Sequence, residues 1–331
     1  MSPKTEELID LIVKLALEEA APEIKTLVGH RFPDDDVWLC CWIARKFISK
    51  TKNAEIIFVN AGETLAGSEG DPSVLHFDTG GREYDQHGKG LKKVSSAVIL
   101  AEKFGLSDDP GLKPLVEMVT AVDNIEPLLP TSIHFTIEGY PRMFQSNGTI
   151  DWRQVQERVF ELFDIVYNQE TIKARSHEDL KKYAEWTTLP NGLKIASLLW
   201  HPGSREAAFE AGAAVVIWTQ SKGPHYFHTG IQSNRNYPAL RLNRIAAFLR
   251  FAEAQTRNIH VSNKDLTYTG RGEPIFVWFL HDSLKLILNG SRSWKPSEDE
   301  YTKLQPRQII GLVHKALSTI PSEVVQKWNK K

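Results

Sequence analysis

The sequence predicts a mixed α/β protein of two domains, with a mostly parallel sheet covered by helices on both faces in the first. Short apolar runs alternate with helical patterns in the first part of the chain, which is typical of such sheets. A chain of 331 residues is longer than one ordinary core. Its 41% hydrophobic and 24% charged residues are typical of globular proteins.

The first domain should contain three strands and three helices. We expect strands at 24–28, 55–59 and 74–77, and helices at 36–47, 95–104 and 112–122, each helix pattern beginning after a turn. In such sheets a ligand binds beyond the carboxyl ends of the strands. His30 and Asp78 would lie at that edge.

The remaining chain should hold a connecting region and a second, smaller α/β domain. We expect boundaries at 1–130, 131–195 and 196–331, with a mainly helical middle segment in which Asp151 caps a helix. The expected elements of the last segment are strands at 213–218 and 226–229, a helix at 240–254, and a hairpin of 275–279 with 284–288.

The composition indicates a cytoplasmic protein without a membrane partner. A net charge of −1 gives no overall field toward nucleic acid or membranes. The N-terminal 25 residues predict an acidic amphipathic helix rather than a signal peptide, and no later run has about 18 uncharged apolar residues. Cys40 and Cys41 are adjacent, which suits buried thiols better than a disulfide.

The segment His30-Arg-Phe-Pro-Asp34-Asp-Asp36 predicts a metal site. A loop after a strand can turn one imidazole and two carboxylates toward one point, and this mixed set suits Mn²⁺ or Mg²⁺. The alternative is a solvated acidic turn that caps the following helix. Both interpretations fit the residues.

Four segments together resemble the motifs of the DHH phosphoesterase superfamily, over about residues 24–125. They are the H-x-x-P-D-x-D run at 30–36, Asp78 after an apolar run, Asp85-Gln86-His87 in the place of D-H-H, and Asp123 in Ala-Val-Asp-Asn. Ser95-Ser96-Ala97 is similar to the small residues that follow D-H-H. The pattern most resembles the branch described as metal-dependent protein hydrolases, whose eukaryotic representatives are similar to RNA exonucleases.

The resemblance implies a metal-dependent hydrolase with two Mn²⁺ or Mg²⁺ ions. One ion would be bound by His30, Asp34 and Asp78, and the other by Asp36, Asp78, Asp123 and either Gln86 or His87. His87 would donate a proton to the leaving oxygen, and Asp85 would orient His87. The chain departs from the family at Gln86, which replaces a histidine and so weakens the second site.

The second domain should bind the substrate. Lys222, His225, His228 and Arg235 could hold an anionic group, or could be exposed residues of an ordinary hairpin. The other histidines, His134 among them, have no recognisable metal spacing. We expect hydrolysis of a phosphodiester of a nucleotide or short oligonucleotide. The alternatives are hydrolysis of another small phosphate or pyrophosphate, and a metal-deficient relative that binds a nucleotide or protein. A homodimer is compatible with each.

Overall fold

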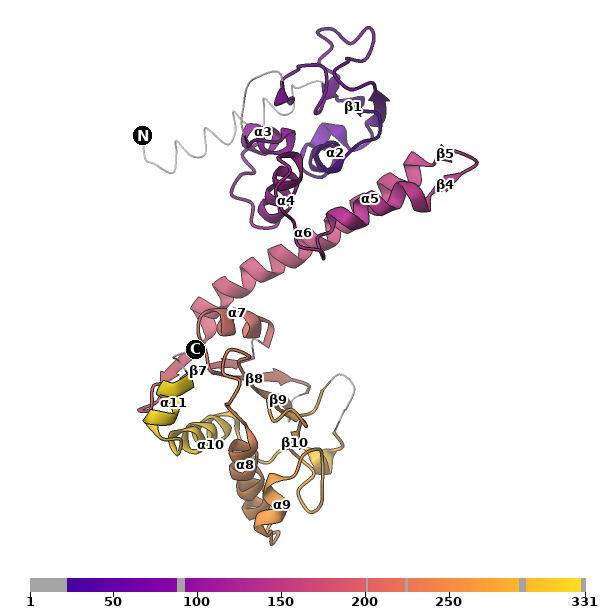
Figure 1. Ribbon diagram of the computed structural model, residues 1–331. Helices are drawn as coiled ribbons and strands as arrows, with labels where there is room; N and C mark the ends of the chain where they lie inside the picture. The colour runs from indigo at the N-terminus through magenta and orange to yellow at the C-terminus, as the bar shows by residue number, and fades with distance from the viewer. Residues whose placement is uncertain (1–22, 88–92, 201, 224–225, 292–295, 329–331) are drawn as a thin grey trace, which may run out of the picture. The chain divides into compact units, whose positions relative to one another are not determined.

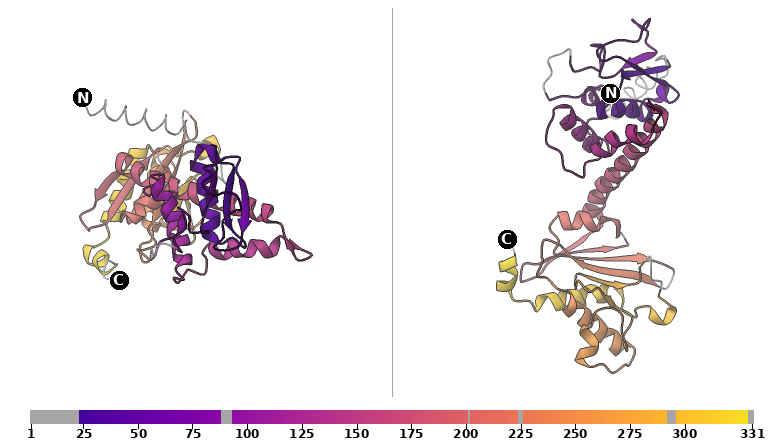
Figure 2. Two further views of the ribbon diagram at one scale, coloured as in Figure 1. Left: turned by 90° about the horizontal axis from the view of Figure 1, so that it is seen from above. Right: turned by 45° about the vertical axis from the view of Figure 1, so that its right-hand side comes forward.

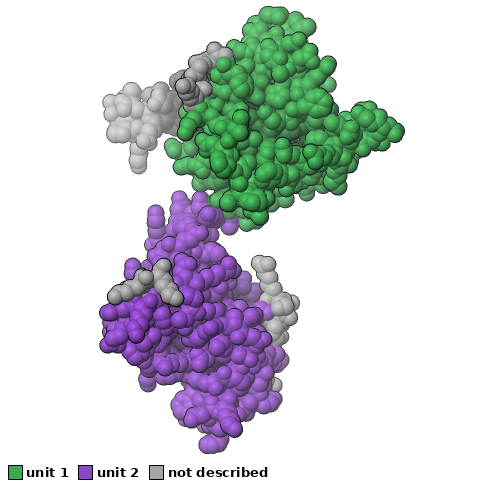
Figure 3. All heavy atoms as spheres, viewed as in Figure 1, with its two compact units in different colours: residues 1–171 green, residues 172–331 purple. Residues whose placement is uncertain are grey.

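The computed structural model describes residues 23–87, 93–200, 202–223, 226–291 and 296–328. The helix expected at the N-terminus falls almost wholly outside these ranges. The chain divides into two compact units, residues 1–171 and 172–331 (Figure 3). Each unit combines helices with a sheet, so the mixed α/β class is confirmed. No helix among the described residues combines the length and apolar character needed to cross a membrane.

A three-stranded parallel sheet forms the base of the first unit. Its strands are β1 (Thr26–His30), β2 (Glu55–Val59) and β3 (Val74–His76), in the order β2-β1-β3. Thr26 of the central strand is paired with Glu55 on one side and with Val74 on the other. The three strands therefore end at the same edge of the sheet, within two residues of the predicted bounds.

Helix α2 (Asp35–Phe47) is the most buried element of the first unit. All ten residues from Asp35 to Ala44 are buried, so the helix has no solvated face over this length. Trp38 packs against Phe58 of β2 with a ring distance of 5.6 Å. Cys40 and Cys41 are free and fully buried, as predicted. Because α2 starts directly after the predicted metal motif, its burial fixes that motif to the core.

Helices α3 (Ser96–Lys103) and α4 (Lys113–Asp123) lie beside α2 (Figure 1). Helix α5 (His134–Met143), the 3-10 turn η1 (Ser49–Thr51) and the short pair β4 (Gln145–Ser146) and β5 (Thr149–Ile150) also belong to this unit. Buried Leu100, Leu115 and Val119 of α3 and α4 belong to the same core as α2. This core lies next to the sheet edge where the strands end.

Helix α6 (Trp152–Tyr183) occupies much of the range 131–195 that was expected to be mainly helical. The Asp151 carboxylate accepts a hydrogen bond of 3.1 Å from the backbone N–H of Gln154, as expected of a cap. The charged stretch from Arg175 to Lys182 continues the helix, because Lys, Glu and Leu favour helices. The end of the range 131–195 holds strand β6 (Glu185–Thr188) and the start of β7 (Lys194–Leu199).

The second unit contains a six-stranded sheet of order β10-β11-β9-β8-β7-β6. Its remaining strands are β8 (Val215–Ser221), β9 (Phe227–Ser233), β10 (Phe279–Leu280) and β11 (Leu286–Asn289). Only β7 and β8 pair in parallel, and the other neighbours are antiparallel. A mostly parallel arrangement is therefore found in the three-stranded sheet and not here.

The predicted hairpin near residue 280 is shorter than expected. The strand begins at Phe279 because side chains already bind the preceding carbonyls. The Tyr268 hydroxyl donates to the carbonyl of Ile275 at 2.6 Å, and the Arg250 guanidinium donates to that of Trp278 at 2.8 Å. These carbonyls are thus bound without a neighbouring strand.

The two faces of the second sheet pack differently. Ile217, Ile231 and Ile287 lie on one face, in a core shared with helices α8 (Asn243–Thr256) and α10 (Pro306–Ser318), which lie along the sheet in Figure 2. On the other face, helix α7 (Arg205–Glu210) packs against part of β7 and β8. The remaining elements are η3 (Pro202–Ser204), α9 (Asn263–Thr267), η4 (Glu298–Glu300) and α11 (Ser322–Trp328).

Candidate metal centre

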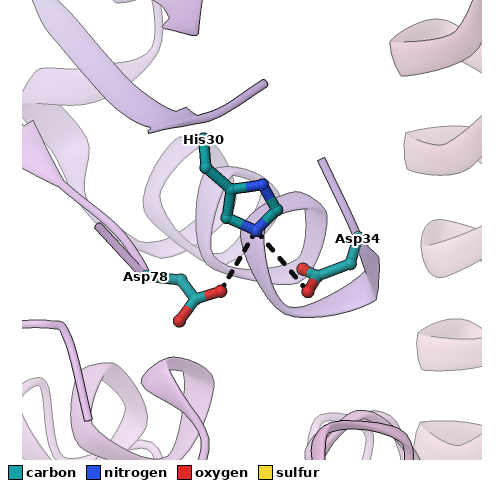
Figure 4. A group of neighbouring side chains, drawn as sticks. All are labelled: His30, Asp34 and Asp78. Atoms are coloured by element: carbon teal, nitrogen blue, oxygen red, sulfur yellow. Dashed lines mark ion pairs between the residues drawn. The ribbon is translucent and has the colours of Figure 1, made fainter. Parts of the chain in front are cut away.

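Three of the predicted metal ligands come together at the carboxyl edge of the parallel sheet (Figure 4). His30 is the last residue of β1, Asp34 caps α2, and Asp78 follows β3. The His30 Nε2 atom is 3.2 Å from Asp78 Oδ2 and 3.5 Å from Asp34 Oδ2. One ligand atom from each residue lies within 4.8 Å of the others. These three side chains could therefore bind one metal ion.

The local backbone explains how the two carboxylates are aimed. Asp34 Oδ1 accepts hydrogen bonds of 3.1 Å from the N–H groups of Asp36 and Val37, which leaves Oδ2 facing His30. The acidic turn is therefore both a helix cap and part of the cluster. Asp78 has φ of 50°, a left-handed conformation that non-glycine residues adopt infrequently. Such local strain is typical of functional sites.

The charges in the cluster favour a cation. Hydrogen bonds that His30 donates to Asp34 and then to Asp78 raise the pKa of His30 to about 10, so the ring is protonated in this arrangement. Burial would raise the pKa of Asp34, but the His30 hydrogen bond and charge outweigh it and lower that pKa. Burial, and then the charge of Asp78, raise the pKa of Asp123. These crowded oxygen donors beside one imidazole fit Mn²⁺ or Mg²⁺.

Asp36 lies beside this cluster and accepts hydrogen bonds from the backbone of helix α3. Its Oδ2 accepts a 2.7 Å hydrogen bond from the backbone N–H of Ser96, and its Oδ1 accepts one of 2.9 Å from that of Ala97. These donors are at the N-terminus of α3, where unpaired N–H groups favour an anion. Burial, followed by the charges of Asp78 and Asp34, raises the pKa of Asp36 well above its usual value. Asp36 thus joins α2 to α3.

Gln86 presents its amide nitrogen to the carboxylates. Its Nε2 atom donates to Asp78 Oδ1 at 2.9 Å and to Asp123 Oδ2 at 3.4 Å. Its oxygen accepts a 2.5 Å hydrogen bond from the Ser96 hydroxyl. The network assigns this amide orientation, because only N–H groups can donate to both carboxylates. Asp123 therefore joins the cluster through Gln86, whose oxygen is turned toward α3.

His87 and Asp85 occupy the turn beyond Asp78. The His87 imidazole is mostly exposed, and its Nε2 atom is 3.2 Å from Asp78 Oδ1. Asp85 accepts hydrogen bonds from the backbone N–H groups of Gly81 at 2.7 Å and of His87 at 2.9 Å. These bonds hold the turn through its backbone. A role for Asp85 in orienting the imidazole stays a prediction.

One contact beside the cluster was missed by the sequence analysis. The Nδ1 atom of His134 in α5 is 2.9 Å from Asp35 Oδ2, and Nε2 is 3.6 Å from Glu138. Burial raises the pKa of Asp35 to about 6, and the contact with His134 opposes that rise. The signal was the run of three aspartates, because adjacent residues at the start of a helix point in different directions and Asp35, the middle one, then faces another element than Asp34 and Asp36 do.

The predicted substrate residues are divided between two places in the second unit. Lys222 and His228 line a cavity of about 590 Å³ together with Arg205 and Trp218. Arg235 lines two other cavities, of about 320 and 490 Å³. His225 lies outside the described residues. The sequence therefore located part of one cavity and missed Arg205 and Trp218.

Two glycines make room for aromatic rings that line the cavity of Lys222 and His228. A Cβ atom on Gly230 would overlap the ring of Trp218, and one on Gly290 would overlap that of His228. The Arg205 guanidinium lies 4.9 Å from the Trp218 ring centroid. Burial, and then the charge of Lys222, lower the pKa of His228. Its ring is therefore neutral at pH 7 and can donate a hydrogen bond to an anion.

The comparisons with known proteins find only limited similarity to this chain. Residues 29–170, which contain the whole cluster, match the family model of the ChrB C-terminal domain, less than half of the chain. No curated protein matches. A solved DHH-domain structure, described as a member of a family of ribosomal proteins, is 12% identical over 97% of this chain and 93% of its own, with a TM-score of 0.31.

A second solved structure, an exopolyphosphatase-related protein from Bacteroides fragilis, is 11% identical over 95% of this chain and 97% of its own. Its TM-score is 0.25. Similarity at these scores establishes neither a shared fold nor a shared function.

Proposed function

We propose that this chain is a metal-dependent phosphoesterase that hydrolyses a phosphodiester of a nucleotide or short oligonucleotide. The convergence of His30, Asp34 and Asp78 within 4.8 Å at the carboxyl edge of a parallel sheet carries the proposal. A hydrolase needs such a set of donors at an accessible edge. His87 lies there too and remains mostly exposed.

The two oxygens of Asp78 give it a central role. Oδ2 faces His30 and Oδ1 faces His87 and Gln86, so this carboxylate touches both sides of the cluster. A bound Mn²⁺ or Mg²⁺ ion would lower the pKa of a coordinated water and neutralise charge on the phosphoryl group. His87, whose Nε2 atom lies 3.2 Å from Asp78, would donate a proton to the leaving oxygen.

The second ion is proposed at Asp36, Asp78 and Asp123, with Gln86 or His87 completing the set. Gln86 donates hydrogen bonds to two of these carboxylates, so its amide has to turn before its oxygen can bind a cation. Asp36 already accepts two backbone hydrogen bonds, and its Oδ1 also accepts one from the Cys40 thiol, so a second lone pair remains on Oδ2. We therefore propose that the first site, formed by His30, Asp34 and Asp78, binds more tightly.

Substrate binding is proposed in the second unit around Lys222 and His228. An ammonium group and a neutral imidazole in one cavity can both donate to phosphate oxygens. Arg205 adds a second cation on the wall of that cavity, although it also bonds to Glu206 at 2.6 Å. Arg235 is a secondary candidate, because it lines another cavity.

A metal-deficient protein that binds a nucleotide or another protein is the second candidate. The contacts of His30 and Gln86 favour it. The His30 cation pairs with two carboxylates, and the Gln86 amide donates to Asp78 and Asp123, so the cluster can neutralise part of its own charge.

Metal titration combined with a substrate panel separates the candidates. We expect Mn²⁺ binding by calorimetry, Mn²⁺-dependent turnover of a dinucleotide, and loss of both with a chelator. A panel containing pyrophosphate and a sugar phosphate tests the other small phosphates. Strong Mn²⁺ binding without turnover of any phosphoester would rule out the hydrolase, and absence of Mn²⁺ binding would favour the metal-deficient candidate.

A further inference from the structure

Phe32 stands between two residues of the metal cluster. It is two residues from both His30 and Asp34, so its Cα lies within roughly 7 Å of each of their Cα atoms along the chain. Its side chain is 73% exposed, although phenylalanine is usually buried. Its φ is 56°, in the left-handed region that bulky residues rarely adopt. A large apolar side chain is thus held in solvent beside the cluster.

The ring of Phe32 is also supported from one side. It meets the ring of Trp152 at 5.9 Å and an interplanar angle of 80°, an edge-to-face contact. Trp152 in turn packs against Trp38 at 6.4 Å and Phe58 at 5.9 Å, two residues anchored in the core. This support limits the rotation of the Phe32 ring, so little freedom is lost when a second flat group stacks on it.

We infer that Phe32 is a stacking contact for the nucleobase of the substrate. The inference rests on the proposed function and makes the substrate class narrower: a phosphate ester whose base lies next to the phosphate. The cluster binds the phosphate, and Phe32 is within reach of the adjoining base. Aromatic side chains stack on all four bases, so this contact favours base-bearing substrates without selecting a sequence.

The test compares two phosphates that differ only in the base. Binding of adenosine monophosphate and of ribose 5-phosphate is measured by calorimetry in Mn²⁺ for the full chain and for Phe32→Ala, Phe32→Leu and Phe32→Tyr. Phe32→Leu keeps apolar bulk without an aromatic face, and Phe32→Tyr keeps the face. Met143→Ala is the matched control, because Met143 is also 73% exposed and lies at the end of α5.

We expect Phe32→Ala and Phe32→Leu to weaken binding of adenosine monophosphate by about 5- to 150-fold, the range for loss of one stacked base. Binding of ribose 5-phosphate should change less than about twofold. Phe32→Tyr and Met143→Ala should bind both ligands as the parent chain does.

Two results would overturn the inference. Equal weakening of both ligands would mean that Phe32 only shapes the metal loop, and unchanged binding of both would mean that the base does not contact it. Failure of the proposed function is seen separately, because a chain that binds the nucleotide through Phe32 but never hydrolyses a dinucleotide retains the stacking contact without the reaction.

Discussion

The metal cluster of the first unit and the cavity of the second unit place their polar side chains in different ways. In the cluster, Asp36 and Asp78 are almost fully buried, and buried donors or backbone N–H groups bind them. In the cavity, Lys222 is exposed, and the rings of Trp218 and His228 lie against Gly230 and Gly290, which carry no side chain. Substitutions in the cluster should therefore affect metal affinity and stability, whereas substitutions around the cavity should affect substrate affinity.

The largest expected effect is that of Asp78→Asn on metal binding. Asp78 contacts His30, His87 and Gln86, and an amide supplies less charge to a divalent cation. We expect at least about 100-fold weaker Mn²⁺ binding and loss of turnover, since even residues outside the ligand set cost roughly 10- to 100-fold. Equilibrium dialysis measures the affinity. Asp108→Asn, an exposed aspartate of the same unit, is the control. Parental manganese content in Asp78→Asn would place the site elsewhere.

Asp36→Ala should give the second largest effect, on stability. It leaves the N–H groups of Ser96 and Ala97 without their acceptor, and each unpaired buried group costs about 1–3 kcal/mol. We expect the free energy of unfolding in a chelator to fall by about 3 kcal/mol. Asp36→Asn retains one acceptor oxygen and should cost about half as much. Urea unfolding gives both values, and equal stability of Asp36→Ala and Asp108→Ala would contradict the link between α2 and α3.

Lys222→Ala is expected to act on substrate affinity alone. It removes a cation from the cavity that also contains His228, so KM for a dinucleotide should rise about tenfold with little change in kcat. Arg235→Ala should have a smaller effect, because Arg235 lines other cavities than Lys222 does. Steady-state kinetics of both variants test this order. A larger effect at Arg235 would move the substrate site away from the cavity of Lys222 and His228.

The smallest expected effect belongs to Gln86→His. Imidazole is a stronger ligand than an amide oxygen for a transition ion, so the Mn²⁺ concentration that gives half-maximal activity should fall about three- to tenfold. The parent chain should lose the second ion on dialysis before the first. Activation curves that coincide for the two proteins would refute a ligand role at position 86, and would indicate that His87 already occupies it.

The sequence predicted local features better than contacts between distant segments. The positions of His30, Asp34 and Asp78 in the sequence were sufficient to predict that these side chains lie together, because the carboxyl ends of parallel strands meet at one edge of the sheet. The orientation of Gln86 was not predictable, because it depends on the Ser96 hydroxyl, ten residues away and on another element. Arg205 was missed for the same reason, since folding brings it to the cavity from a helix outside the predicted hairpin.

The extent of helix α6 was not predictable for a different reason. The charged residues from Arg175 to Lys182 are good helix formers whose charges can remain in solvent, so they continue the helix without an apolar pattern. Leu180 is only 4% exposed and anchors that part of the helix in a core with Ala207 and Ala208. A single apolar residue among charged ones gives too weak a hydrophobic periodicity to predict that Leu180 packs against Ala207 and Ala208.

The two adjacent cysteines of α2 can be used to follow opening of the first unit. Cys40 and Cys41 are fully buried, and burial raises the pKa of the Cys40 thiol well above its usual value and that of Cys41 to about 12. Neither thiol therefore reacts while the helix stays packed, and alkylation must await an opening of α2. Because the helix begins at the metal cluster, an ion bound only by the closed form should slow labelling in proportion to its occupancy. A thiol reagent and a mass spectrometer would then time these openings without a chromophore or an added tag.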